Sequence, residues 1–142
     1  MRIPTVEEAL KGETNIMLAT VENDHPRVRP VTLLEHEGDL FVLTGSSNSK
    51  TKQIQANQNV EVLRLVEYQD RTGYIRFSAI AKIVEDPEIR KRVANASSYF
   101  YEYWESPESP QYTLLHLVPN RIEYMKPGQQ YPELIKKFEF TK

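Results

Sequence analysis

The stretch that decides the fold is residues 27–57, RVRPVTLLEHEGDLFVLTGSSNSKTKQIQAN. Two strand-like segments, 27–34 and 40–44, flank a polar break that contains Gly38. A loop of small polar residues then leads into a short helix predicted at about 49–57. Short strands joined by tight polar turns are typical of an antiparallel meander. This stretch therefore predicts two paired strands, followed by a helix that begins close to the end of a strand.

Strand-like segments continue on both sides of this stretch. An apolar segment precedes it and ends at the turn pair Asn23-Asp24, and three more follow. Six short strands in sequential hairpins predict a mainly β (α+β) fold, in which a small closed antiparallel barrel removes the exposed sheet edges. The further strands are predicted at residues 16–22, 60–67, 73–85 and 112–118, the last continuing past Pro119-Asn120 to Met125.

Three further helices are predicted from their start signals and apolar spacing. Thr5 and Glu8 have the spacing of a capping box, so a short helix begins there. Asp86-Pro87 is a typical helix start, and apolar residues then recur at intervals of three and four as far as Tyr103. This pattern predicts one helix of about four turns. The tail from Pro132 is predicted to form a short terminal helix.

Composition bounds the class of protein. The 142 residues include 18 Lys and Arg, 20 Asp and Glu and no Cys, and they fit a single domain over residues 1–142. A net charge of −2 argues against a dedicated nucleic-acid binder. The lack of Cys excludes disulfides, thiolate metal sites and a Cys nucleophile. No apolar run approaches the roughly 20 residues that span a bilayer, and no signal peptide is visible. We therefore expect a cytoplasmic protein with no nucleic-acid or membrane partner.

Two arginines on one strand form the first candidate site. Arg27 and Arg29 are two residues apart, so they project from the same face about 6.6 Å from each other. Two guanidiniums beside apolar neighbours are costly unless an anion neutralises them. The alternative is a solvated edge strand, and Pro30 is compatible with an edge because it cannot donate to a central ladder.

The loop and helix after the third strand form the second candidate site. A helix N-terminus has free N–H groups that bind anions, and Ser49 and Lys50 would add a hydroxyl and a charge. The alternative is that Ser49 only caps a basic surface helix. The segment GSSNSKT is not a phosphate-binding P-loop, because Ser49 replaces the required glycine and the spacing from Gly45 is one residue short.

The histidines and the aromatic segment are weaker signals. His25, His36 and His116 are not spaced as ligands on one helix, so no metal site is predicted, and no catalytic residue is identified. His116 alternates with two leucines and should face away from what they bury. Trp104 ends the aromatic segment 99–104 and could belong to the core or form a wall for a flat ligand.

The order of these motifs resembles that of the pyridoxamine 5'-phosphate oxidase-like family of FMN-binding split β-barrels, especially its general-stress-protein type members. The resemblance covers about residues 4–127. The matching pieces are MLATV (17–21), RVRPV (27–31), LFVLT (40–44), Ser49-Lys50 with Gln53 and Asn57, GYIRFSAIA (73–81), Asp86-Pro87, and YTLL (112–115) with Pro119 and IEY (122–124).

The resemblance implies a homodimer with FMN sites at the subunit interface. Arg27, Ser49 and Lys50 would form the phosphate site, with Gln53 nearby. The strand that carries Val28 would lie along the flavin ring. The cofactor-binding residues that the resemblance implies are Arg27, Val28, Arg29, Pro30, Thr44, Ser49, Lys50, Gln53 and Trp104, of which Trp104 would come from the partner subunit.

The resemblance leaves the activity open. A true pyridoxamine 5'-phosphate oxidase has a C-terminal segment with Arg and His residues that hold substrate, whereas this chain ends PELIKKFEFTK, so that activity is not expected. The family also includes members that use a deazaflavin or haem, or no cofactor. We expect an FMN-dependent oxidoreductase acting on an unidentified small molecule. The alternatives are a non-catalytic flavin-binding or stress-response protein, and a cofactor-free dimeric interaction module. Ile89, Val93, Phe100 and the tyrosines beyond them offer more apolar surface than one small barrel needs, which is the reason to expect a dimer.

Overall fold

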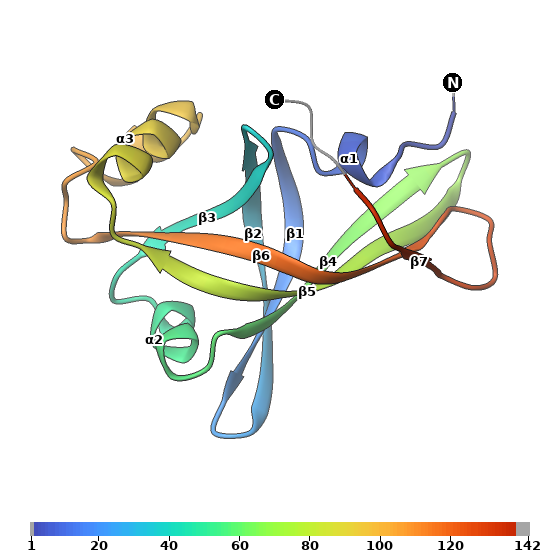
Figure 1. Ribbon diagram of the computed structural model, residues 1–142, viewed down its shortest axis with the longest axis horizontal. Helices are drawn as coiled ribbons and strands as arrows, with labels where there is room; N and C mark the ends of the chain where they lie inside the picture. The colour runs from blue at the N-terminus through green and yellow to red at the C-terminus, as the bar shows by residue number, and fades with distance from the viewer. Residues whose placement is uncertain (1, 139–142) are drawn as a thin grey trace.

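Six antiparallel strands close into a ring because β6 pairs with β3 as well as with β5 (Figure 1). The computed structural model describes residues 2–138. Around the ring the order is β3-β2-β1-β4-β5-β6, and Leu40–Gly45 of β3 pair with Leu117–Tyr112 of β6. The predicted six-stranded antiparallel barrel is therefore confirmed. The strands are β1 (Glu13–Glu22), β2 (His25–His36), β3 (Asp39–Gly45), β4 (Asn59–Tyr68), β5 (Arg71–Val84) and β6 (Tyr112–Met125).

The ring is only partly joined between β2 and β3. β2 pairs with β1 along its whole length, but it meets β3 only where Leu34–His36 lie opposite Phe41–Asp39. Within the described residues, the edge of β2 from His25 to Leu33 therefore has no strand partner on the β3 side. Unpaired backbone N–H and C=O groups at such an edge are available to bind another molecule.

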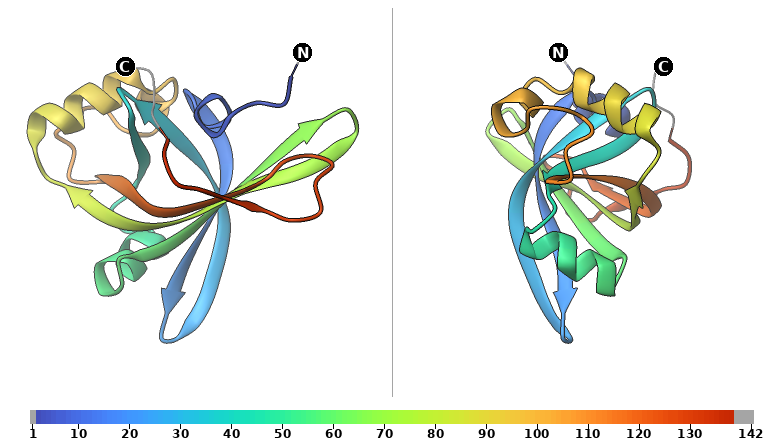
Figure 2. Two further views of the ribbon diagram at one scale, coloured as in Figure 1. Left: turned by 45° about the vertical axis from the view of Figure 1, so that its right-hand side comes forward. Right: turned by 90° about the vertical axis from the view of Figure 1, so that its left-hand side faces the viewer.

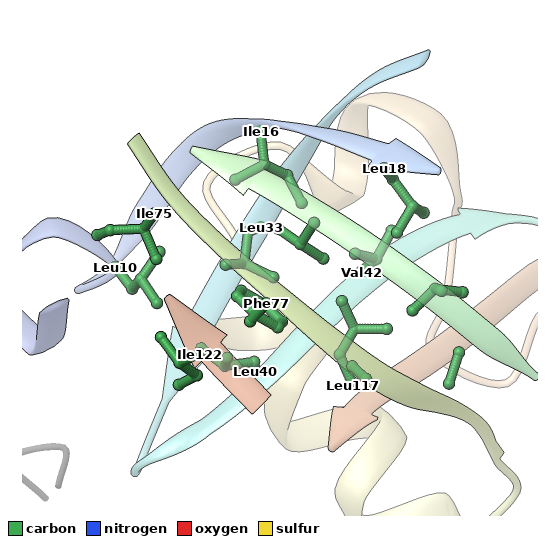
Figure 3. Packing of buried hydrophobic residues seen from close by; sticks show 14 of the residues in the cluster. Leu10, Ile16, Leu18, Leu33, Leu40, Val42, Ile75, Phe77, Leu117 and Ile122 are labelled. Carbon is green, nitrogen blue, oxygen red and sulfur yellow. The ribbon is translucent and has the colours of Figure 1, made fainter. Parts of the chain in front are cut away.

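The interior of the barrel is filled by alternate residues of every strand. Leu33, Leu40 and Phe77 come from three different strands and lie close together between them (Figure 3). All three are at most 1% exposed. Short helices complete this core from both ends: α1 (Val6–Ala9) begins at the predicted capping box, and α2 (Ser49–Ala56) contributes Ile54. Each strand thus has one face committed to the core, which sets the direction of every other side chain on it.

A second apolar cluster lies outside the barrel, beneath α3 (Pro87–Ala96) and α4 (Phe100–Tyr103). Asp86 caps α3 as predicted, but the single four-turn helix is wrong. The helix stops because Ser97 adopts an extended conformation, and its hydroxyl then accepts a hydrogen bond from Tyr99 N at 3.2 Å. Serine competes with helix formation in this way. The break turns Phe100 inward, where it is fully buried.

The predicted terminal helix is also wrong. Glu133–Ile135 instead form the short strand β7, which pairs with Tyr124–Ile122 of β6. The second half of β6 extends beyond its pairing with β3, so its edge accepts another strand. The end of the predicted helix, residues 139–140, lies outside the described residues. β6 itself continues past Pro119 as predicted, with a register shift against β5 at Ser78/Ala79.

Two elements lie at one end of the molecule and matter for the site. The views in Figures 1 and 2 place α2 and the tip of the β1–β2 hairpin at the end opposite α1 and α3. The tip is the predicted Asn23-Asp24 turn, whose two residues have φ values of 49° and 65°. Among the helices of the described residues, none has both the length and the apolar character needed to cross a bilayer.

Candidate functional site

The end of the barrel next to α2 is polar, because Arg29 and Thr20 take the places of apolar residues there. Arg29 follows the series of Leu33 and Val31 on β2, and Thr20 follows Ile16 and Leu18 on β1. The Arg29 guanidinium donates hydrogen bonds to Leu18 O at 3.0 Å and to Thr20 Oγ1 at 2.8 Å. Arg29 therefore fills the end of the barrel and is not the solvated edge residue that the sequence left open.

Gln53 of α2 joins this end of the barrel to the helix. Its side-chain carbonyl Oε1 accepts a hydrogen bond from Arg29 at 2.8 Å and another from Thr20 Oγ1. Gln53 is 7% exposed, so these bonds are shielded from water. All three acceptors of Arg29 are uncharged, and within residues 2–138 no carboxylate neutralises it. Burial lowers the pKa of Arg29.

Lys50 brings a second cation next to Arg29. It is 9% exposed, and among the described residues its Nζ has no hydrogen-bond or ion-pair partner. Its pKa is lowered, first by burial and second by the charge of Arg29. An ammonium that is partly removed from water and has no anion beside it is unfavourable. The two candidate sites of the sequence therefore come together, and Arg27, Arg29 and Lys50 are called the cationic cluster below.

Arg27 has a partner that the sequence analysis missed. Its guanidinium lies 3.3 Å from Glu22 Oε1 in an ion pair of two half-exposed side chains. The other carboxylate oxygen of Glu22 accepts a hydrogen bond from Gln53 Nε2 at 3.0 Å. These bonds, that from Gln53 first and that from Arg27 second, lower the pKa of Glu22. Thr20 and Glu22 are site residues that the sequence analysis missed. Both could have been found from the alternation of β1, because residues 18, 20 and 22 share one face of the strand, the same face as Arg27 and Arg29 on β2.

The first turn of α2 is open to solvent on one side. Its N-cap is Asn48, whose Oδ1 accepts from Lys50 N at 3.2 Å, so the sequence alternative in which Ser49 is the cap is wrong. Ser49 is exposed, and its hydroxyl remains available. Thr51 fastens the turn to the end of β3 by donating to Gly45 O at 3.0 Å. Helix N–H groups, a hydroxyl and a lysine thus lie in one turn, which is suitable for an anion.

Thr44 supplies a buried hydroxyl without a partner. It is 4% exposed and continues the inward-facing series of Leu40 and Val42 on β3. Within residues 2–138 its Oγ1 makes no hydrogen bond. A buried hydroxyl normally has a partner, and leaving it without one costs about 1–3 kcal/mol. Thr44 therefore places one unsatisfied hydroxyl at the end of β3.

Val28 and Pro30 lie on the other face of β2. Val28 is 68% exposed, and Pro30 is exposed as well. They alternate with Arg27 and Arg29 along the part of β2 that has no partner on the β3 side. This part of β2 therefore offers an apolar outer face, a cationic inner face and a free backbone edge between them.

Trp104 is not brought to the cationic cluster within one chain. Its ring packs on those of Phe100 and Tyr112, with centroids 5.2 and 5.4 Å away, and its Nε1 donates to Gln111 O at 3.2 Å. These contacts place Trp104 in the apolar cluster beneath α3 and α4. Whether Trp104 reaches the site of a partner subunit, as the resemblance implies, stays a prediction.

Three of the residues expected to drive dimer formation are used within the chain. Val93 and Phe100 are 1% and 0% exposed, and Ile89 packs against the same cluster. These three therefore offer no surface for a dimer, whereas Tyr101 and Tyr103, which belong to the same expectation, are 59% and 70% exposed.

Several strands of the described chain also expose large apolar side chains. Ile83 on β5 and Leu134 on β7 are 37% and 49% exposed, and Met17 on β1, Val28 on β2 and Leu65 on β4 are 41%, 68% and 50% exposed. β1 pairs with both β2 and β4, so Met17, Val28 and Leu65 belong to one continuous sheet.

His25 lies beside the cationic cluster, opposite Glu22 at the tip of the β1–β2 hairpin, whereas His36 and His116 lie away from it, under α3. His116 faces outward between Leu115 and Leu117 as predicted, and it stacks on Phe41 at 5.1 Å. His36 and His116 both line a small cavity of about 120 Å³ under α3. In the part of the chain that the structure describes, no group of three or more His, Asp or Glu side chains is placed to hold a metal ion.

Comparison with known proteins gives a family and several similar structures. The family model described as pyridoxamine 5'-phosphate oxidase matches residues 3–126. General Stress Protein 26 from Bacillus anthracis str. Sterne is 25% identical, with a TM-score of 0.70 over 89% of this chain and 93% of that one. No curated protein sequence matches the chain.

Two more distant structures share the fold. The heme binding protein from Mycobacterium smegmatis is 13% identical, with a TM-score of 0.75 over 95% of this chain and 59% of that one. The heme storage protein HutZ from Vibrio cholerae is 16% identical, with a TM-score of 0.63 over 82% of this chain and 87% of that one.

Proposed function

The chain belongs to the pyridoxamine 5'-phosphate oxidase family, and on that premise we propose that it binds FMN, with the phosphate at the cationic cluster, and acts as a flavin-dependent oxidoreductase. The family has members that bind flavin and members that bind heme. The charged residues of this chain support FMN as the ligand.

One observation carries the proposal: Lys50 is buried beside Arg29, and no carboxylate of the described residues neutralises either of them. Two partly desolvated like charges repel each other, and the protein tolerates this cost where a ligand offsets it. A phosphate monoester carries about −1.5 to −2 charges at pH 7 and three acceptor oxygens. It therefore fits this cluster better than a neutral ligand does.

The remaining groups fit the rest of the cofactor. The first turn of α2 adds N–H groups and the Ser49 hydroxyl to the proposed phosphate site. The unpartnered hydroxyl of Thr44 is one further group that a bound cofactor would satisfy. The free backbone edge of β2 around Val28 and Arg29 offers donors and acceptors to the polar edge of a flavin ring. We propose that these residues hold the cofactor.

The chemistry that FMN supplies when bound is electron transfer between a donor and a substrate. The chain itself needs to bind, orient and shield the cofactor, and these tasks do not require an acid–base pair. Val28 and Pro30 give the outer face of β2 an apolar surface that excludes water from whatever covers it.

The proposal includes a homodimer. Met17, Val28 and Leu65 expose apolar side chains on one sheet, and stable subunit interfaces are apolar at their centre. A second copy packed there would cover the outer face of β2 and complete the flavin site. Trp104 of that copy is the residue that the family resemblance places over the site.

The test is to purify the protein and release any bound cofactor with denaturant, followed by its mass and absorption spectrum. FMN in about one copy per chain is the expected result. Protein without cofactor would then be titrated with FMN and riboflavin, and NAD(P)H-dependent bleaching with turnover would show catalysis. A haem spectrum, or no binding of either flavin, would overturn the proposal. FMN binding without turnover would refute the oxidoreductase activity and favour the alternative of a non-catalytic flavin-binding protein.

A further inference from the structure

We infer that Glu22 sets the charge of the ligand that the cationic cluster accepts, by placing one carboxylate among three cations. This inference rests on the proposed phosphate site and names a selectivity residue within it. Glu22 is not implied by the family resemblance, and no comparison assigns it a role. It follows from the contacts at the tip of the β1–β2 hairpin.

The geometry places Glu22 at the centre of the cluster's hydrogen-bond network. One oxygen lies 3.3 Å from Arg27, and the other accepts from Gln53 Nε2 at 3.0 Å. The same Gln53 accepts from Arg29 at 2.8 Å through its carbonyl. Glu22 is therefore linked directly to one arginine and through a single side chain to the other. It is the carboxylate in contact with this network among residues 2–138.

Glu22 lowers the net positive charge of the site. Arg27, Arg29 and Lys50 together with Glu22 carry a formal charge of +2. A phosphate monoester at pH 7 carries about −1.5 to −2 and matches this balance. Without the carboxylate the same site would have a charge of +3, which favours more highly charged anions such as pyrophosphate. Glu22 thus lowers affinity for every anion and lowers it most for the most highly charged ones.

The ion pair with Glu22 also holds Arg27 in the absence of a ligand. Arg27 is about half exposed and has no other ion-pair partner among the described residues. A phosphate that recruits Arg27 must compete with this carboxylate. Glu22 therefore acts on the ligand through its charge, both by lowering the net charge of the site and by competing for Arg27. A variant that keeps the shape of Glu22 but removes its charge separates this role from a structural one.

The experiment uses Glu22→Gln in the full chain, with Glu85→Gln as the matched control. Glu85 is exposed in the segment between β5 and α3, so the Glu85→Gln substitution removes the same charge at a position outside the cluster. Affinities for FMN and riboflavin are measured by titration at low salt. Inorganic phosphate and pyrophosphate are tested by the shift in melting temperature, against chloride at equal ionic strength.

We expect Glu22→Gln to bind FMN about two- to fivefold tighter, which is the size of a partly exposed charge interaction. Riboflavin affinity should not change, and the stabilisation by pyrophosphate should increase more than that by phosphate. Glu85→Gln should behave as the parent does with all four ligands. A merely structural Glu22 would weaken both flavins alike or leave them unchanged, and either result overturns the inference.

The inorganic anions separate this inference from the proposed function. If the parent binds no flavin, the proposed function fails, and the Glu22 inference is decided by the anions alone. Larger shifts with phosphate and pyrophosphate in Glu22→Gln than in the parent would then support it. Equal shifts in the two proteins, or no shift in either, would overturn it. If FMN binds but Glu22→Gln gains no affinity, the function stands and the role of Glu22 is refuted.

Discussion

Arg29 on β2 and Gln53 on α2 are joined by a 2.8 Å hydrogen bond from the guanidinium to the side-chain carbonyl. Gln53 also binds Glu22 through its amide nitrogen at 3.0 Å, so one buried glutamine connects an arginine to a carboxylate. This contact fixes α2 against the end of the barrel. It holds the two candidate anion sites of the sequence in one place before any ligand arrives, which reduces the ordering cost of binding.

The first prediction is that Lys50→Met weakens FMN binding and leaves riboflavin binding nearly unchanged. Lys50 is assigned to the phosphate, and a charge-assisted contact is worth about 1.5–3 kcal/mol, or roughly 10- to 150-fold in affinity. Methionine keeps much of the apolar stem, so the protein without cofactor should be as stable as the parent or more stable. Titration with both flavins and urea unfolding check this. An equal loss for both flavins would remove Lys50 from the phosphate site.

The second prediction concerns pH. Burial and Arg29 lower the pKa of Lys50 below its ordinary value of 10.5, so the empty site holds this proton less tightly than the unfolded chain does. A bound phosphate favours the charged ammonium. FMN affinity should therefore fall as pH rises through the lowered pKa, in a window that begins below pH 10.5. Riboflavin titrated over the same range corrects for ionisation of the ring, and Lys50→Met should lack this dependence.

The third prediction is that Gln53→Leu destabilises the fold by about 1–3 kcal/mol, because it leaves buried donors on Arg29 and Thr20 without their acceptor. Gln55→Leu is the matched control, since Gln55 lies on the exposed side of the same helix. It should change the free energy of unfolding by less than about 0.5 kcal/mol. Urea unfolding of both variants gives the comparison. Equal stability of the two variants would show that the network does not hold α2 in place.

The fourth prediction is that Arg27→Gln lowers FMN affinity and its dependence on salt. Arg27 is half exposed and paired with a half-exposed Glu22, so the stability of the protein without cofactor should change by less than about 0.5 kcal/mol. Salt screens the charge that this variant removes, so the parent should lose more FMN affinity than the variant between low and high salt. The same affinity and salt dependence in both proteins would place Arg27 outside the site.

The fifth prediction tests the proposed dimer. Leu65→Glu adds a charge to the apolar outer sheet and should yield a monomer by sedimentation at micromolar concentration, with loss of bound FMN. Tyr131→Glu is the control, because Tyr131 is 77% exposed outside this sheet and should leave the dimer intact. A parent that is already monomeric would refute the dimer and the two-subunit flavin site together.

Much of the fold could be predicted from the sequence because its signals are local. The six strands of the barrel follow from apolar alternation and turn residues, and the start of α3 follows from Asp86-Pro87. The failures occurred where local preference competes with tertiary pairing. The tail after Pro132 joined an open edge of β6, and Ser97 ended a helix that the apolar spacing would have continued.

The candidate site, like the fold, was predictable where its geometry is local and unpredictable where it depends on tertiary contacts. The sequence by itself determined which residues carry charge, that Arg27 and Arg29 share one face of a strand, and that Lys50 lies in the first turn of a helix, because strand and helix periods are local geometry. Only the tertiary structure decided that these groups meet around Gln53. It also showed that Glu22, 31 residues away from Gln53, is the carboxylate among them. Contacts of that kind depend on closure of the barrel, which brings β1, β2 and α2 to one end, and no local period encodes which polar side chains will face each other there.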